Sequence, residues 1–271
     1  MIDFHTHIFP DVIAEKSIPH LAKVCKTEPF TDGKKDGLLC SAEEAGLDCS
    51  IVLPVVTAPK QFDSIHRFAM QFLEGKLISF GGIHPEHDDY KEKLRWIKKQ
   101  GFKGIKLHPD YQETYFNDIR YKRILSYASE LELIVITHAG FDPVCPNDIH
   151  CTPQMAAEVI DEVKPTKLVL AHMGGNEMAD AVEQYLIGKD VYLDTAYVLD
   201  KMCSEQFVGM VRNHGADKIL FATDSPWGRQ KEYVELFHAL PLSEDEKNMI
   251  GHENARNLLN KKMVDEPHRM C

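Results

Sequence analysis

The sequence alternates between two kinds of segment, and this alternation constrains the fold more than any other feature. Eight short runs rich in Val, Ile and Leu are predicted strands, and each is followed by a stretch with the apolar spacing of an amphipathic helix. The predicted strands are residues 2–7, 49–54, 77–84, 104–108, 133–138, 167–172, 191–194 and 219–224. The predicted helices are residues 41–45, 61–73, 90–99, 119–130, 153–163, 178–186, 204–213 and 231–239.

Strands that are apolar on both faces and alternate with helices indicate parallel βαβ units. Eight such units predict an α/β fold, a single (β/α)8 TIM barrel that occupies residues 1–271 as one domain. The main alternative is an open, doubly wound sheet, but no glycine-rich GxGxxG follows the first predicted strand. No linker rich in Gly, Ser or Pro divides the chain.

Two regions depart from this regular pattern. Residues 9–39 contain three prolines and are predicted to form a long loop excursion over the barrel mouth. Ser41 followed by Glu44 has the spacing of a capping box and predicts that a helix begins there. Ser243 followed by Glu246 has the same spacing, so a helical tail is predicted from about residue 243, with residues 251–261 also helical.

The composition excludes several functions. A formal net charge of −11 and a pI near 5.7 argue against nucleic-acid binding through a basic face. The chain has no run of about eighteen apolar residues and no charged leader before the first strand, so we expect a cytoplasmic protein without a membrane span. Seven irregularly spaced cysteines without a CxxC motif favour reduced thiols over a disulfide framework.

Ionisable residues stand at the carboxyl ends of nearly all the predicted strands. His5 and His7 lie two residues apart on the first strand, so their side chains share one face. The other strand-end candidates are His84, Lys106, His108, His138, His172, Asp194 and Asp224. In a parallel barrel all these strand ends lie on one face, which holds the active site. Converging imidazoles and carboxylates are typical of a divalent metal site.

Purely structural roles are the alternative explanation for the same residues. A buried histidine often only satisfies its own hydrogen bonds, and His172 could pack in this way beneath Gly174 and Gly175. Asp224, followed by Ser and Pro, could cap a helix. For one histidine such a role is the simpler explanation. For several histidines at strand ends of one barrel, a shared metal site explains the pattern better.

The strand-end residues resemble the pattern of the amidohydrolase superfamily. The matching residues are His5, Thr6, His7, Lys106, His138, His172 and Asp224. The closer similarity is to the branch that includes aminocarboxymuconate semialdehyde decarboxylase, the resorcylate decarboxylases and various lactone hydrolases. The stretch FATDSPW at residues 221–227 is especially characteristic, and the similarity spans nearly the whole chain. The resemblance implies a metal-dependent TIM-barrel enzyme.

The resemblance also implies roles for individual residues. It implies one divalent ion rather than two, with Zn2+ expected first and Mn2+ as the alternative. The implied ligands are His5, His7, His138 and Asp224. His172 would act beside the ion as an acid/base group or oxyanion stabiliser, or would ligate a second ion in a binuclear site. Lys106 would either be carboxylated, as in binuclear members, or contact a substrate carboxylate.

This ligand set supports hydrolysis, because a bound zinc lowers the pKa of its water from about 15.7 to about 7. Metal-bound hydroxide would attack a small carboxylated substrate such as a lactone or amide, with Asp224 transferring the proton and His172 polarising the carbonyl. Lys106, His108 and Trp227 are predicted to contact the substrate, Lys106 through its charge. The expected partner is a small anionic molecule, without nucleic acid or membrane; a homo-oligomer is left open.

Two other functions remain as alternatives. The same metal and the same Asp224 would support non-oxidative decarboxylation of an unsaturated or aromatic acid, with protonation at carbon in place of attack by water. A catalytically silent metal-binding barrel is the third hypothesis, although no expected ligand has been lost. The compact chain and the intact pair His5 and His7 favour hydrolysis. The substrate and the roles of His84, His108 and Asp194 stay open.

Overall fold

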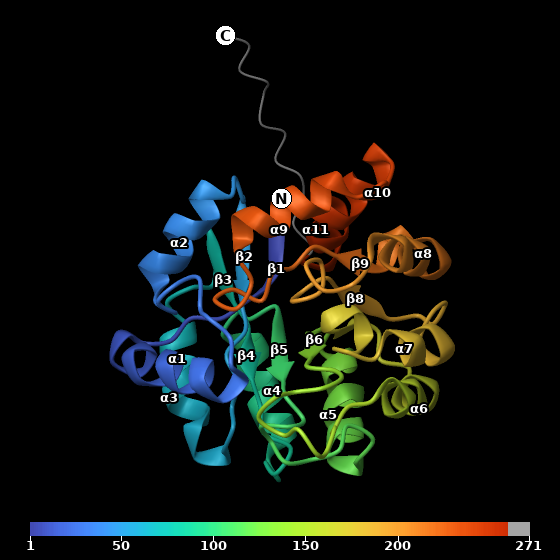
Figure 1. The fold of residues 1–271 in the computed structure, drawn as a ribbon. Helices are drawn as coiled ribbons and strands as arrows, with labels where there is room; N and C mark the ends of the chain where they lie inside the picture. Colours follow the sequence, from blue (N-terminus) through green and yellow to red (C-terminus); the bar gives the residue numbers. More distant parts are fainter. Residues whose placement is uncertain (260–271) are drawn as a thin grey trace.

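The computed structural model describes residues 1–259 and confirms the predicted α/β barrel, in which helices surround a ring of parallel strands (Figure 1). The strands are β1 (Ile2–Thr6), β2 (Cys49–Val52), β3 (Leu77–Ser79), β4 (Gly81–Gly82), β5 (Gly104–Leu107), β6 (Ile134–Thr137), β7 (Leu168–Leu170), β8 (Tyr192–Asp194) and β9 (Ile219–Leu220). The helices are α1 (Asp11–Cys25), α2 (Lys35–Glu44), α3 (Phe62–Ala69), α4 (Tyr90–Lys99), α5 (Ile119–Glu130), α6 (Pro153–Val163), α7 (Ala179–Tyr185), α8 (Ser204–His214), α9 (Gln230–Ala239), α10 (Glu244–Asn248) and α11 (Asn254–Leu259). Short 3₁₀ turns at Pro59–Gln61, His172–Gly174 and Ala216–Lys218 and a π-helical turn at Met249–Glu253 complete the described elements.

The strands pair in sequence order, which is the topology of a closed barrel. Strands β1 to β3 form one set of neighbours and β4 to β9 another. The single strand predicted at residues 77–84 is divided into β3 and β4 at Phe80, whose backbone N–H still donates to the carbonyl of Val52 at 2.9 Å. The ring closes where the Phe4 N–H donates to the Phe221 carbonyl and the Asp224 N–H donates to the His5 carbonyl, each at 2.9 Å.

Strand side chains are buried on both faces, which explains their apolar character. Phe4, Ile136 and Val169 belong to the core inside the barrel. Residues of the opposite phase, such as Ile105 and Leu170, belong to the larger core between strands and helices. Because side chains alternate along a strand, the few polar side chains in the inward phase must be held by hydrogen bonds or serve a site.

The predicted loop at residues 9–39 is wrong, because most of it is helical. Helix α1 runs through Pro19, and its apolar side chains such as Ile13 and Leu21 face a cavity instead of the barrel core. The predicted helix start at Ser41 is also wrong, since α2 begins at Lys35 and Ser41 lies inside it. A Ser and a Glu three residues apart occur within helices as well as at their starts, so the spacing alone does not identify a cap.

The carboxyl-terminal prediction is confirmed within the described residues. The Ser243 hydroxyl accepts from the Glu246 N–H at 3.2 Å, and the Glu246 carboxylate accepts from the Ser243 N–H at 2.7 Å, so this capping box forms. Residues 260 and 261 of the predicted tail lie outside the described residues. Within residues 1–259, every helix is too short or too polar to cross a lipid bilayer.

Candidate metal centre and active site

One large cavity of about 850 Å³ opens at the carboxyl ends of the strands, and the predicted site residues meet there. The predicted residues that line it are His5, His7, Lys106, His108, His138, His172, Asp224 and Trp227. The barrel therefore brings together side chains from five of its strand ends, as the topology predicts. Two further candidates, His84 and Asp194, are buried outside the cavity lining.

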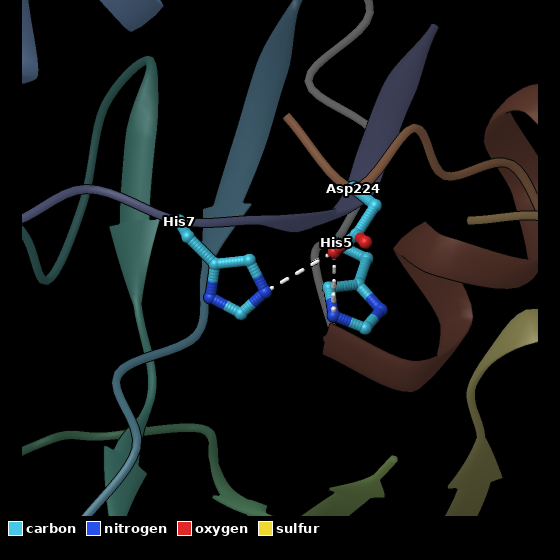
Figure 2. A group of neighbouring side chains, drawn as sticks. All are labelled: His5, His7 and Asp224. Carbon is cyan, nitrogen blue, oxygen red and sulfur yellow. Dashed lines mark ion pairs between the residues drawn. The ribbon is translucent and has the colours of Figure 1, made fainter. Parts of the chain in front are cut away.

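Three of these side chains form a compact donor group (Figure 2). The His5 Nε2 lies 3.4 Å and the His7 Nε2 lies 3.2 Å from the Asp224 Oδ1. His5 lies on β1 and His7 directly follows this strand, while Asp224 follows β9, the strand that closes the barrel against β1. Two imidazole nitrogens and one carboxylate, with their ligand atoms within 4.8 Å of one another, are a donor set that binds Zn2+ or Mn2+.

Hydrogen bonds on the far side of each ring orient the two histidines. The His7 Nδ1 lies 2.9 Å from the Leu53 carbonyl, which only accepts, so Nδ1 carries the proton and Nε2 presents its lone pair. The His5 Nδ1 lies 2.9 Å from the Asp194 carboxylate, which fixes the same arrangement. Asp194, whose role the sequence left open, therefore lies behind His5 as the carboxylate that orients it.

The charges of the group also suit a cation. Burial raises the pKa of Asp224, but the neighbouring imidazoles of His7, His5 and His172 lower it to about 2, so this carboxylate is ionised at neutral pH. Burial keeps the pKa of His5 well below its ordinary value, so its ring is neutral. The Lys106 Nζ lies 3.0 Å from the His5 Nε2, and burial lowers the pKa of this ammonium to about 8. The donor group thus already faces one positive charge.

The backbone is strained at two of the predicted catalytic residues. Asp224 has φ of 65° and His172 has φ of 57°, in the left-handed region that non-glycine residues rarely adopt. Such conformations cost on the order of 1–3 kcal/mol each and are concentrated at functional sites. Both side chains line the cavity.

Asp3 holds the segment that carries Asp224. Its carboxylate accepts from the Thr223 N–H at 3.1 Å, from the Thr223 hydroxyl at 2.5 Å and from the Gln230 amide at 2.8 Å. Burial raises the pKa of Asp3 to about 7, and these hydrogen bonds oppose that shift. Asp3 is thus a structural residue beneath the site that joins the first strand to the last.

His138, the fourth predicted ligand, lies apart from the group of His5, His7 and Asp224. Its Nδ1 is 3.0 Å from the Nε2 of His172, whose own Nδ1 donates to the Ala196 carbonyl at 2.8 Å. The His172 Nε2 therefore presents a lone pair to His138. Either His138 donates a proton to this lone pair or both nitrogens face an ion, and the predicted ligand role of His138 stays a prediction.

Three residues that the sequence reasoning did not select as site residues lie around His108 and His138. The ring of Tyr111 stacks on His108 with 3.8 Å between centroids, and His108 stacks on His138 at 4.3 Å. The Asp142 Oδ2 lies 3.5 Å from the His108 Nε2, and the Asp110 Oδ2 lies 3.8 Å from the His138 Nε2. The sequence does hold a signal for the two carboxylates, because each follows a strand-end histidine within four residues.

Comparisons with known proteins agree with this architecture. A family model described as Amidohydrolase matches residues 2–261. A search of the curated proteins found no match. Among solved structures, 2,6-dihydroxybenzoate decarboxylase from Rhizobium is 18% identical, with a TM-score of 0.70 over 96% of this chain and 98% of that chain.

Two other solved structures illustrate the range of neighbours. A dihydroxybenzoic acid decarboxylase from Polaromonas, with bound manganese and 2-nitroresorcinol, is 16% identical, with a TM-score of 0.67 over 96% of each chain. A probable 2-pyrone-4,6-dicarboxylic acid hydrolase from Acinetobacter baumannii, with citric acid bound, is 14% identical, with a TM-score of 0.65 over 96% of this chain and 98% of that chain. At these identities the likeness concerns the fold.

Proposed function

The chain belongs to the amidohydrolase family, and we propose that it is a metal-dependent enzyme that releases carbon dioxide from an aromatic or unsaturated carboxylic acid. The observation that carries this proposal is the donor group of His5, His7 and Asp224 at the inner end of a large cavity, beside the buried Lys106. The Lys106 ammonium beside a metal-binding group suits an anionic substrate, whose carboxylate pairs with the lysine while a second oxygen of the substrate approaches the ion.

The residues present fit a divalent cation. The Nε2 atoms of His5 and His7 present lone pairs, and Asp224 is ionised. The Lys106 ammonium lies 3.0 Å from the His5 Nε2, so a positive charge already faces this nitrogen. A divalent ion bound there would supply Lewis acidity toward substrate oxygens. Zn2+ and Mn2+ both accept these ligands, and the Polaromonas neighbour supports the second.

The side chains around the metal-binding group have separate roles in the proposed reaction. Lys106 pairs with an anionic group of the substrate and holds it in place. In the reaction the bond between carbon and carboxylate breaks, its electron pair stays on the carbon, carbon dioxide leaves and the carbon takes up a proton. Asp224 is ionised, so it would hold the ion and has no proton to deliver to the carbon. His172, when both ring nitrogens are protonated, is the residue we assign to deliver the proton to carbon.

Hydrolysis of a carboxylated lactone is the second candidate. The sequence alone favoured it because both histidines of the first strand are intact. The pyrone dicarboxylic acid hydrolase from Acinetobacter baumannii also supports it. We place decarboxylation first because both dihydroxybenzoate decarboxylases among the neighbours act on aromatic acids.

An assay on a panel of acids and lactones separates these two functions. Protein loaded with Zn2+ or Mn2+ is incubated with hydroxybenzoates and with pyrone or simple lactones, and carbon dioxide release and ring opening are recorded. We expect carbon dioxide release that Asp224→Asn abolishes and that Asp245→Asn, an exposed carboxylate on α10, leaves unchanged. Ring opening without carbon dioxide would establish the second candidate. Loaded protein inactive on the whole panel would contradict both.

A further inference from the structure

The cavity extends well beyond the metal-binding group. Its volume of about 850 Å³ lies in the upper part of the range, roughly 300–1,000 Å³, that buries drug-sized ligands. From the group of His5, His7 and Asp224 it reaches residues of the helices α1 and α3, which both lie on the left of the barrel in Figure 1. A single-ring acid bound at the group would leave this outer part unfilled.

Helix α1 presents an apolar face to the outer part of the cavity. Ile13, Leu21 and Val24 line it, at spacings that place them on one side of a helix, with Ser17 and His20 between them. Ile13 is 48% exposed and Val24 is 38% exposed, so these apolar side chains are only partly covered by the protein itself. Val12, on the same helix, is 69% exposed and is not part of the lining.

Helix α3 supplies a second apolar wall. Ile65 and Phe68 line the cavity and lie three residues apart, again on one helix face. No lysine, arginine or carboxylate from α1 or α3 lines the cavity in the described chain. The charged lining residues, among them Lys106 and Asp224, lie at the strand ends or in the loops that follow them. Between the two helices the lining is thus free of such charges and mainly apolar, although Ser17, His20, Cys25 and Ser64 also contribute to it.

We propose that the apolar space between α1 and α3 binds an alkyl or arylalkyl chain of the substrate, so that the substrate is an acid with an extended apolar tail. The inference rests on the proposed function for the position of the acid group, which lies near Lys106 and the metal-binding group. The tail contacts Ile13, Leu21, Val24, Ile65 and Phe68. The continuity of this space with the metal-binding group favours substrate over a separate partner.

Alkyl hydroxamates test this inference, because their head group chelates divalent ions while the tail length varies. Binding to Zn2+-loaded protein is measured by calorimetry for the series from acetohydroxamate to decanohydroxamate. We expect the affinity to rise by up to about fourfold for each buried methylene until the space is filled. Leu21→Asn and Ile65→Asn should flatten this rise and leave acetohydroxamate binding unchanged. Val12→Asn, the matched control on α1, should behave as the wild type.

The possible results of these measurements either support or overturn the proposed binding of an apolar tail. Affinity independent of chain length in the wild type overturns the inference while leaving the metal site in place. If no hydroxamate binds, the proposed metal site is wrong. Calorimetry with decanoate and acetate then tests the apolar space alone. Tighter binding of decanoate than of acetate, lost in Leu21→Asn, supports the inference. A chain-length effect equal in Val12→Asn, Leu21→Asn and the wild type contradicts it. Chain-length independence with a dimer by light scattering would assign the apolar face to a second copy.

Discussion

His138 and Asp110 face each other across 3.8 Å without forming a hydrogen bond. The Nε2 of His138 and the Oδ2 of Asp110 are both buried, and neither has a partner within residues 1–259. A buried polar atom without a partner costs about 1–3 kcal/mol. When an ion lies between His138 Nδ1 and His172 Nε2, the His138 proton is on Nε2 and is directed at the Asp110 carboxylate. With the proton there, the Nδ1 lone pair faces His172 and the interior of the site.

Asp110→Asn should therefore change the tautomer of His138. An amide attracts the Nε2 proton less than a carboxylate does, so the proton is free to shift to Nδ1. If His138 contributes to metal binding, the affinity for Zn2+ should fall about 10- to 100-fold. The ¹⁵N shifts of labelled histidine and chelator competition measure the two effects. Asp148→Asn, an exposed carboxylate of the same region, is the control, and unchanged ¹⁵N shifts in Asp110→Asn would contradict the assignment.

Asp194→Asn tests the residue behind His5. The asparagine oxygen can still accept from the backbone N–H groups of His172 and Ala196, as Asp194 Oδ1 does, but its amide nitrogen replaces the oxygen that holds the His5 Nδ1 proton. We expect metal affinity to drop about 10- to 100-fold in a folded protein. Asp190→Asn, just before β8 and exposed, should bind metal as the wild type does. Full affinity in Asp194→Asn would rule out the orienting role.

Lys106 predicts a pH dependence of anion binding. Burial lowers its pKa to about 8, so the ammonium is charged at pH 7 and loses its proton as the pH rises through 8. Loss of the positive charge should weaken benzoate binding, by at most about tenfold per pH unit above 8. Calorimetry from pH 6.5 to 9.5 measures this, and Lys106→Met should bind weakly with no such decline. If the benzoate affinity of Lys106→Met still declined above pH 8, another group would be titrating. The same conclusion would follow if the control Lys99→Met lost the decline.

Gly140 makes a close approach that only glycine permits. It has φ of +87°, and a Cβ there would lie 2.1 Å from the backbone nitrogen of Asn176. Gly140→Ala should lower the free energy of unfolding by about 2–3 kcal/mol. Gly75→Ala is the matched control: Gly75 has φ of +93° with open space around it, so only the backbone strain of about 1–2 kcal/mol applies. Urea unfolding compares them, and equal losses would mean that the contact with Asn176 is unimportant.

Local sequence signals determined several elements fully. Helices α4, α5 and α6 coincide with the residues predicted for them. Thr152 illustrates the reason: its hydroxyl accepts from the Met155 N–H at 3.2 Å and Pro153 occupies the first turn, so the start of α6 is encoded within four residues. Helix α1 was missed because its apolar residues line the cavity, and because Pro10 before it and Pro19 within it resemble the prolines of a loop.

The sequence by itself determined that His5 and His7 share one face, and it predicted that most strand-end side chains converge, because side chains alternate along a strand and the carboxyl ends of parallel strands lie on one face of a barrel. Only the tertiary structure decided that Asp194 stands behind His5 and that Asp110 faces His138. Which atoms meet across a barrel depends on how loops pack and how far each strand is staggered. Those positions are set by contacts between residues distant in sequence, and no local pattern encodes them.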